Sequence, residues 1–226
     1  MLKRAFKDIL TAAEKQGWVM EPEAKQLLSM AGIAVPGCKW AQDEDEAVQF
    51  AGDIGYPVVA KVVSPRVVHK SDVGGVVAGI PDDAQLRDVF RGFSRMEAFA
   101  GVLVEEMLAG IELIAGGKMD YQFGPVVLLG IGGTEAEIYK DTSLRMAPLT
   151  EKDVASMVMG LRARALLEGY RGAGPIHLKK LSDLMIAFSN LMMDLEDHIA
   201  SIDLNPVMCS PEGCVAADAR IMLAGH

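Results

Sequence analysis

Segments with helical periodicity alternate with short apolar runs along most of the chain, and this alternation limits the possible fold more than any other feature. In the first two segments apolar residues recur at helical spacing. These segments stop at Gly17 and Gly32, residues suited to the left-handed turn that ends a helix. The apolar runs 58–63 and 76–80 are too short for helices, are rich in valine and are bounded by proline or glycine, as strands are. The alternation predicts mixed α and β lobes.

The same pattern locates the individual elements to within about two to four residues. We expect helices in the segments 2–13, 22–31, 43–53, 82–96, 151–159, 163–167 and 179–195. We expect strands in the segments 58–63, 76–80, 102–107, 112–115, 125–129, 199–208 and 214–223, with an extended piece after Pro36 and polar turns through Asp141.

Charge and composition exclude several classes of protein. The formal net charge of −9 argues against non-specific nucleic-acid binding, because phosphate backbones are held by an excess of Lys and Arg. The N-terminal segment 1–17 is charged throughout, unlike a signal peptide. No apolar stretch approaches the roughly 20 residues needed to cross a bilayer. We therefore expect a cytoplasmic protein with no membrane and no nucleic-acid partner. Cys38, Cys209 and Cys214 lack metal-type spacing, and we expect them to be small buried hydrophobic residues with no chemical role.

The two last expected strands form a hairpin that gathers polar side chains on one face. The turn-forming string 210–213 joins them, and pairing of Cys209 with Cys214 sets the register. With this register the polar face carries Asp203, Asn205, Asp218 and Arg220, with Asn205 opposite Asp218 and Asp203 opposite Arg220. The other face carries Ile202, Leu204, Val215 and Ala217. Three oxygen-bearing side chains suit a hard cation such as Mg²⁺. The alternative is a solvated face with an ion pair between Asp203 and Arg220.

A loop between two expected strands, residues 64–75, combines paired glycines with cationic side chains. The backbone at Gly74 and Gly75 could cradle phosphate oxygens, although paired glycines between strands are also typical of a simple tight turn. Lys61, on the preceding strand, is costly to bury unless it meets an anion or snorkels at a sheet edge. His69 could accept a phosphoryl group through its imidazole, or could be an exposed polar loop residue.

Four strings, taken together and in order, resemble the ATP-grasp fold. They resemble most the β subunit of ADP-forming acyl-CoA synthetases, such as acetate–CoA ligases, a group related to the succinyl-CoA synthetase β subunit. The strings are Glu21–Glu23 through Gly32–Pro36, His69–Val76, Phe123–Val127 with Gly130–Gly133, and Asp203–Pro206. The resemblance extends from about Val19 over nearly the whole chain. It implies an α+β fold in which two α/β subdomains hold ATP between them. The implied parts are an N-terminal helix (1–18), a lid subdomain (19–105) and a core subdomain (106–226).

The resemblance also implies contacts with a nucleotide, ATP or ADP. Lys61 resembles the lysine that reaches the phosphates. Backbone groups near Glu105 and Met107 resemble the hinge that meets the adenine, and Glu112 resembles the acidic residue that binds the ribose. Arg145 resembles the arginine near the terminal phosphate, where its planar fork could grip oxygens.

The implied metal ligands and phosphate carrier lie in the two motifs described above. Asn205 and Asp218 match the Mg²⁺ ligands of the family, in agreement with the hairpin register. His69 matches a histidine that is transiently phosphorylated and relays the phosphoryl group to ADP, with the Gly74–Gly75 backbone beside it. Asp203 either orients His69 or assists the metal.

The complete synthetase also needs a CoA-binding domain and a ligase-like domain with another phosphohistidine, and we find neither in this chain. The resemblance therefore implies a separate CoA-binding α subunit in a hetero-oligomer such as an α2β2 heterotetramer. The implied reaction is the reversible acyl-CoA + ADP + Pi = carboxylic acid + CoA + ATP. Two alternatives remain open. One is another ATP-grasp carboxylate ligase that works without a phosphohistidine, and the other is a non-catalytic module that senses ATP.

Overall fold

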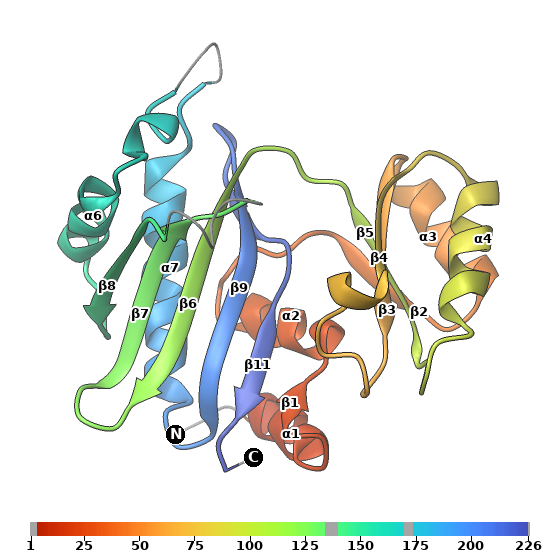
Figure 1. Cartoon of the computed structure of the whole chain (residues 1–226), viewed down its shortest axis with the longest axis horizontal. Coiled ribbons are helices and arrows are strands. Elements are labelled where there is room, and N and C mark those ends of the chain that lie inside the picture. The colour runs from red at the N-terminus through yellow and green to blue at the C-terminus, as the bar shows by residue number, and fades with distance from the viewer. Residues whose placement is uncertain (1–3, 134–139, 170–173, 226) are drawn as a thin grey trace. The chain divides into compact units, whose positions relative to one another are not determined.

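The chain folds into two compact units, each with its own antiparallel sheet (Figure 1). The structure, a computed structural model, describes residues 4–133, 140–169 and 174–225. The larger unit combines residues 1–35 with 109–226, and the smaller unit is formed by residues 36–108. The expected division differs from this one at the N-terminus. The segment 4–35, which we expected to form a separate helix and the start of the lid, belongs to the larger unit, because apolar side chains from Phe6 to Ile33 pack in its core.

The larger unit is built on a seven-stranded sheet with the strand order β1-β11-β9-β6-β7-β8, in which β10 pairs with β9. Every neighbouring pair is antiparallel. The strands are β1 (Trp18–Val19), β6 (Ile111–Asp120), β7 (Gly124–Ile131), β8 (Thr142–Met146), β9 (Ile199–Cys209), β10 (Cys214–Ala216) and β11 (Arg220–Leu223).

One face of this sheet is covered by helix α7, which crosses β6 and β7 in Figure 1. A Cβ atom added at Gly117 of β6 would lie 2.4 Å from the sulfur of Met192 in α7, so the glycine permits the close approach. Helix α6 begins with a capping box between Thr150 and Asp153. The helices of this unit are α1 (Arg4–Ala13), α2 (Glu21–Met30), α6 (Glu151–Gly160) and α7 (Leu178–Asp194), with a 3₁₀ turn at Arg164–Leu166.

The smaller unit has a four-stranded sheet with the order β2-β5-β3-β4, packed against two helices. Each helix begins after an aspartate whose side chain accepts hydrogen bonds from backbone N–H groups of the first turn. This residue is Asp43 for α3 and Asp82 for α4. The elements are β2 (Cys38–Ala41), α3 (Glu44–Ile54), β3 (Val58–Val63), a 3₁₀ turn at Ser71–Val73, β4 (Val76–Ile80), α4 (Asp83–Phe93) and β5 (Gly101–Glu106).

Most predicted elements are present, and the exceptions have clear causes. Strands β3 and β4 have the bounds expected from the sequence, and the mixed α and β class is correct. The expected strand 214–223 is interrupted after Ala216 and resumes at Arg220. The expected helix 163–167 is only a 3₁₀ turn, and the edge strand β8 was not predicted, because its side chains alternate in exposure without a buried face. Within the part of the chain that the structure describes, no helix is long and apolar enough to span a membrane.

Candidate nucleotide and magnesium site

The hairpin register agrees with the sequence prediction and places Asn205 opposite Asp218. Cys209 pairs with Cys214, and Asp203 pairs with Arg220. Between these pairs the strand is interrupted, but the N–H of Ala217 still donates to the carbonyl oxygen of Pro206 at 2.9 Å, which preserves the register. Asn205, on β9, is therefore opposite Asp218, which lies in the short segment between β10 and β11.

The polar face of the hairpin also carries Asp203 and Arg220. Leu204 and Ala219, the positions between the two polar pairs, are buried, so the pairs on either side of them point away from the core. The guanidinium of Arg220 donates to the Asp203 carboxylate at 2.8 Å, and both side chains are about one third exposed (33% and 39%). The ion pair that we weighed as an alternative to a metal site is thus present, on the same face as Asn205 and Asp218.

The predicted apolar face is correct on one side of Asn205 and wrong on the other. Val215 and Ala217, which we expected to be buried, are partly exposed, and Cys214 and Ala216 are buried in their place. The cause is an extra residue in β9 at Asn205–Pro206. Leu204 pairs with Ala115 of β6 and Val207 pairs with Leu113, so β9 has one residue more than β6 between the two pairs. Such a bulge shifts the alternation of the side chains beyond it.

The donor set of the hairpin fits a magnesium ion. Among residues 4–133, 140–169 and 174–225, no group of three or more His, Cys, Asp or Glu side chains could hold a metal ion. Mg²⁺, however, is commonly held by one or two protein oxygens, with water and substrate phosphates completing the octahedron. The Asn205 amide and the Asp218 carboxylate could supply those oxygens.

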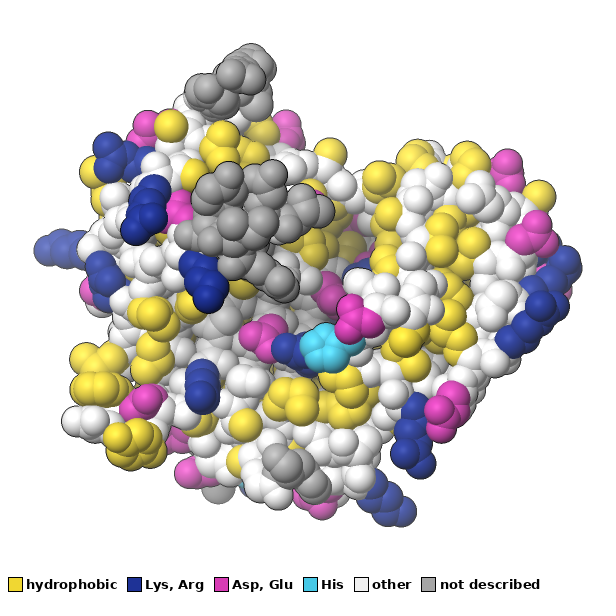
Figure 2. Space-filling view, in the orientation of Figure 1, with side chains coloured by type: hydrophobic (Ala, Val, Ile, Leu, Met, Phe, Trp, Pro, Cys, Tyr) yellow, Lys and Arg dark blue, Asp and Glu magenta, His cyan; other side chains and the backbone are white. Residues whose placement is uncertain are grey.

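A pocket of about 480 Å³ adjoins this polar face in the larger unit. Asp203 lines it together with Gly116, the residue directly opposite on β6, and an added Cβ there would lie 3.8 Å from the Asp203 carboxylate. Its apolar side is formed by Leu128 and Leu144. Hydrophobic side chains also reach the surface near the β6–β7 turn and the end of β8 (Figure 2), where Tyr121, Phe123 and Met146 are exposed.

The structure does not bring Arg145 to the polar face. Successive pairing across β9, β6, β7 and β8 joins Asp203 to Gly116, Gly116 to Leu128 and Leu128 to Leu144. Leu144 therefore shares the face of Asp203, and its neighbour Arg145 takes the opposite face. There its guanidinium donates to the hydroxyl of Ser156 in α6 at 2.7 Å. Arg145 therefore does not share the face of Asp203, and its predicted place beside the terminal phosphate gains no support from this geometry.

Glu112 lies on β6 opposite Met208, and its side chain is exposed. The segment after β7 approaches its backbone closely. The N–H of Gly132 donates to the Glu112 carbonyl oxygen at 2.8 Å, and a Cβ at Gly132 would lie 2.9 Å from that oxygen. The role of Glu112 in binding the ribose stays a prediction.

In the smaller unit, Lys61 and Glu105 form a buried ion pair. The Lys61 ammonium is 3.0 Å from the Glu105 carboxylate, and the side chains are 8% and 3% exposed. They are diagonal neighbours on the paired strands β3 and β5, because Val59 pairs with Glu105 and Lys61 with Leu103. The anion that Lys61 was expected to need is thus supplied in part by this carboxylate, and the alternative of a snorkelling lysine is wrong.

From the sequence we expected only a backbone role for Glu105, and its side-chain ion pair was not predicted. A signal was present, since Glu105 follows three apolar residues in a run that reads as a buried strand. Met107 lies just beyond the end of β5, and its side chain is 48% exposed.

The glycine loop of the smaller unit is a tight turn rather than a ready phosphate cradle. Its two glycine N–H groups already donate within the loop, Gly74 to the Ser71 carbonyl oxygen and Gly75 to that of Lys70 at 2.7 Å. Gly74 has a φ of +67°, and a Cβ at Gly75 would lie 2.6 Å from a methyl group of Val62. The pair of glycines therefore shapes the turn, and the expected phosphate contact through these N–H groups is not supported. His69, in the same loop, is exposed.

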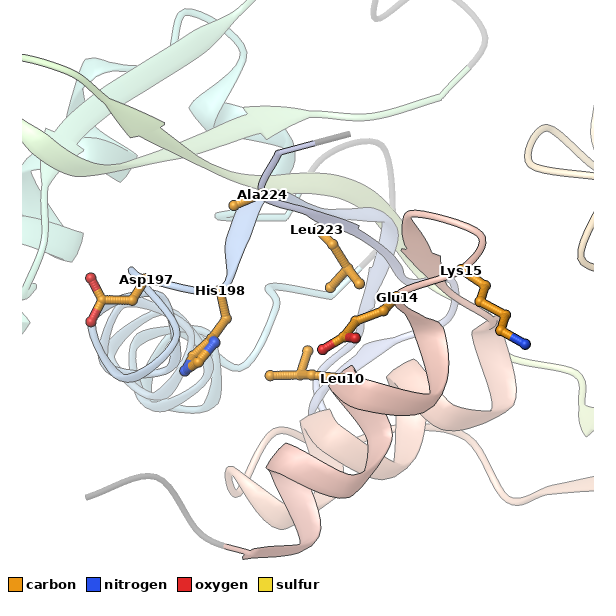
Figure 3. Close-up of a pocket in the computed structure, with 7 residues that line it drawn as sticks. All are labelled: Leu10, Glu14, Lys15, Asp197, His198, Leu223 and Ala224. Atoms are coloured by element: carbon orange, nitrogen blue, oxygen red, sulfur yellow. The ribbon is translucent and has the colours of Figure 1, made fainter.

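A second pocket lies elsewhere in the larger unit, between α1, the end of α7 and the end of β11 (Figure 3). It measures about 510 Å³, and Glu14 and His198 point into it from different elements, whereas Lys15 points away. None of the predicted site residues lines it.

Comparison with known proteins supports a nucleotide site. An ATP-grasp domain model matches residues 11–223. The β subunit of acetate–CoA ligase (ADP-forming) I from Pyrococcus furiosus is 41% identical over 213 residues, which is 91% of each chain. The 4-hydroxybutyrate–CoA ligase (ADP-forming) of Nitrosopumilus maritimus is 38% identical over 220 residues, and this chain spans 31% of its length. A succinate–CoA ligase β subunit from Haloarcula marismortui is 26% identical over 224 residues.

Solved structures agree. The acetyl-coenzyme A synthetase 1 of Ca. Korarchaeum cryptofilum, in complex with coenzyme A and Ca-AMPCP, matches with a TM-score of 0.90 and 41% identity over 96% of this chain and 99% of that one. Another structure of the same enzyme holds Mg-AMPPCP, with its phosphohistidine segment pointing towards the nucleotide binding site (TM-score 0.85, 39% identity, 96% and 99% coverage). The fold is therefore the ATP-grasp fold, as the sequence predicted. The chain belongs to the family of β subunits of ADP-forming acetate–CoA ligases, which are acid–thiol ligases.

Proposed function

We propose that this chain binds ADP or ATP with Mg²⁺ and passes a phosphoryl group between a histidine and the nucleotide. The reaction served is the reversible acyl-CoA + ADP + Pi = carboxylic acid + CoA + ATP. The observation that carries the proposal is the hairpin register that sets Asn205 opposite Asp218 on the face of Asp203, in a chain of this family. The Mg-AMPPCP held by the Korarchaeum enzyme supports it.

In this proposal each residue contacts the metal ion, the nucleoside or the phosphates. Asn205 and Asp218 hold Mg²⁺, which when bound neutralises charge on the nucleotide phosphates. Glu112 binds the ribose, and the backbone near Glu105 and Met107 meets the adenine. These groups position and neutralise the reactants, which is the main work of a protein in phosphoryl transfer.

Lys61 supplies the cation for the phosphates and is kept ready by Glu105. The Glu105 carboxylate, 3.0 Å from the Lys61 ammonium, offsets part of the cost of burying that charge. Arriving phosphate oxygens then meet a charge that is already desolvated and oriented. Arg145 and the N–H groups of Gly74 and Gly75 have no part in this proposal, since the structure engages them elsewhere.

His69 is the phosphate carrier of this chain. Its side chain is exposed, in the loop between β3 and β4. The nitrogen–phosphorus bond breaks as the terminal oxygen of ADP forms its bond to phosphorus, and the imidazole keeps the released electron pair. Asp203, whose carboxylate is held by Arg220, either orients the phosphorylated imidazole or assists the metal.

The proposal includes a CoA-binding α subunit as partner, in a cytoplasmic hetero-oligomer such as α2β2. The support is that one similar protein is itself named a β subunit, and that this chain spans only 31% of a relative in which the activity resides in one long chain.

The experiment is to mix the chain with γ-labelled ATP and magnesium and to measure acid-labile, base-stable phosphate on the protein. We expect wild type to be labelled and His69→Asn to lose the label. His198→Asn, a change at another exposed histidine, is the control and should label as wild type does. Equal labelling of the His69 variant would overturn the relay. Full ligase activity of that variant with its partner would favour the carboxylate ligase that needs no phosphohistidine.

A further inference from the structure

Cys209 and Cys214 lie directly opposite each other in the C-terminal hairpin, one on β9 and the other on β10. At the turn the N–H of Ser210 donates to the Gly213 carbonyl oxygen at 2.8 Å, so the next pair along is one without mutual backbone hydrogen bonds. In such a pair the Cα atoms are about 4.5 Å apart and both side chains point to the same face. Disulfides bridge Cα atoms about 4.4–6.8 Å apart, so the backbone already has a suitable spacing.

The two thiols are hydrogen-bonded to each other, and their pKa values move in opposite directions. The hydrogen bond with Cys214, followed by burial, raises the pKa of the Cys209 thiol, whereas the hydrogen bond with Cys209 lowers the pKa of the Cys214 thiol. Cys209 is fully buried, while Cys214 is 4% exposed and follows the exposed turn residues Pro211 and Glu212. Of the two thiols, Cys214 is nearer to the surface and has the lowered pKa, so we take it as the attacking cysteine.

We propose that Cys209 and Cys214 form a redox modification site that reacts with low-molecular-weight disulfides, such as glutathione disulfide, to give a cross-strand disulfide. The Cys214 thiolate attacks one sulfur of the small disulfide, forming a mixed disulfide and releasing one small thiolate. The Cys209 thiol then loses its proton and its sulfur attacks that of Cys214, releasing the second small thiolate. The two protein thiols are oxidised to one disulfide, and the small disulfide is reduced to two thiols that carry away both protons.

This site does not depend on the proposed function, because it rests only on the hairpin register and on the sulfur atoms. It has a consequence for that function, however. Asn205 lies on β9 and Asp218 just beyond β10, so a bond between Cys209 and Cys214 would covalently join the two segments that present the proposed magnesium ligands.

The test uses the full chain with Cys38→Ser, so that only the hairpin thiols remain of the three in the sequence. The folded protein is incubated with glutathione disulfide, free thiols are alkylated, and the chain is cleaved after Glu212, which separates the two cysteines. We expect an intact mass lower by two hydrogen atoms, no alkylated thiol, and two peptides joined until a reductant is added. Cys209→Ser should stop at a mixed glutathione disulfide on Cys214, and Cys214→Ser should leave Cys209 as a free thiol.

The same chain, refolded from denaturant in the same glutathione buffer, is analysed in parallel, because refolding removes the barrier of burial. Two alkylated cysteines in both samples would overturn the proposal, as would a mixed disulfide that persists with both cysteines present. A disulfide found only in the refolded sample would also overturn it, since the site in the folded protein would then be unreactive.

Discussion

Asn205 and Asp218 face each other across the C-terminal hairpin at the point where β10 has ended and β11 has not yet begun. The pairs that flank it keep the same register, with Ala216 paired to Val207 on one side and Arg220 to Asp203 on the other. Strand β9 therefore presents Asn205, and the short segment between β10 and β11, held at both ends, presents Asp218. A cation bound there would be coordinated by one neutral and one negative oxygen.

Replacement of Asp218 should weaken nucleotide binding in a magnesium-dependent way. With Asp218→Ala we expect the affinity for Mg·ATP to fall by more than about tenfold, a loss of ~1.4 kcal/mol, because the only charged ligand of the pair is removed. Isothermal titration with and without magnesium measures this. Glu212→Ala, a change at the exposed hairpin turn, is the matched control. If both variants bind Mg·ATP equally well, the hairpin is not the metal site.

The glycine turn of the smaller unit gives a prediction about stability. Gly75→Ala should lower the free energy of unfolding by about 1–3 kcal/mol, because the new Cβ would lie 2.6 Å from a methyl group of Val62. In a Val62→Ala background the same change should cost less, since the clashing methyl group is gone. Gly92→Ala, in helix α4 with open space around it, should be neutral or stabilising. Chemical denaturation of the four variants measures these effects, and additive costs at positions 75 and 62 would contradict the packing argument.

The hairpin illustrates what could be predicted from the sequence and what could not. Its register followed from a turn string and two flanking cysteines, because strand pairing must count outward from the turn. The face taken by Val215 and Ala217 did not follow, because the bulge in β9 depends on how β9 pairs with β6. That pairing joins segments far apart in the chain.

Long-range pairing also explains the other two differences at the site. The sequence indicated that Lys61 needs an anion, but Glu105 becomes its partner only because β3 and β5 are neighbours. Arg145 was placed by its resemblance to a motif. Its direction is set by β8, a strand that lacks the buried alternation by which strands are recognised.

The capping box of α6 makes a prediction about acid. The hydrogen bonds from the Thr150 hydroxyl and then the Thr150 N–H lower the pKa of the Asp153 carboxyl. Because the folded pKa lies below the unfolded one, this contribution to stability is complete above the ordinary aspartate pKa. It is lost as the pH falls through the lowered value. In Thr150→Val we expect the pKa of Asp153 to rise towards its ordinary value, as followed by NMR titration. An unchanged pKa would show that the hydroxyl does not hold this carboxylate, and Lys152→Ala serves as the control.

The buried pair of Lys61 and Glu105 allows stability to be separated from binding. Lys61→Met leaves the Glu105 carboxylate buried without the ammonium, and we expect it to lower the free energy of unfolding by about 3–5 kcal/mol. Glu105→Leu should cost a similar amount for the reverse reason. The double variant replaces both charges with apolar groups of similar size, so most of the lost stability should return.

Nucleotide binding should behave differently in the same cycle. If Lys61 contacts the phosphates, the double variant should still bind ATP more weakly than wild type, although its free energy of unfolding is close to that of wild type. Thermal or chemical denaturation and ATP titration of the four proteins provide both readouts. A double variant that regains both stability and wild-type affinity would show that the ion pair is structural and that the phosphates are held by other cations.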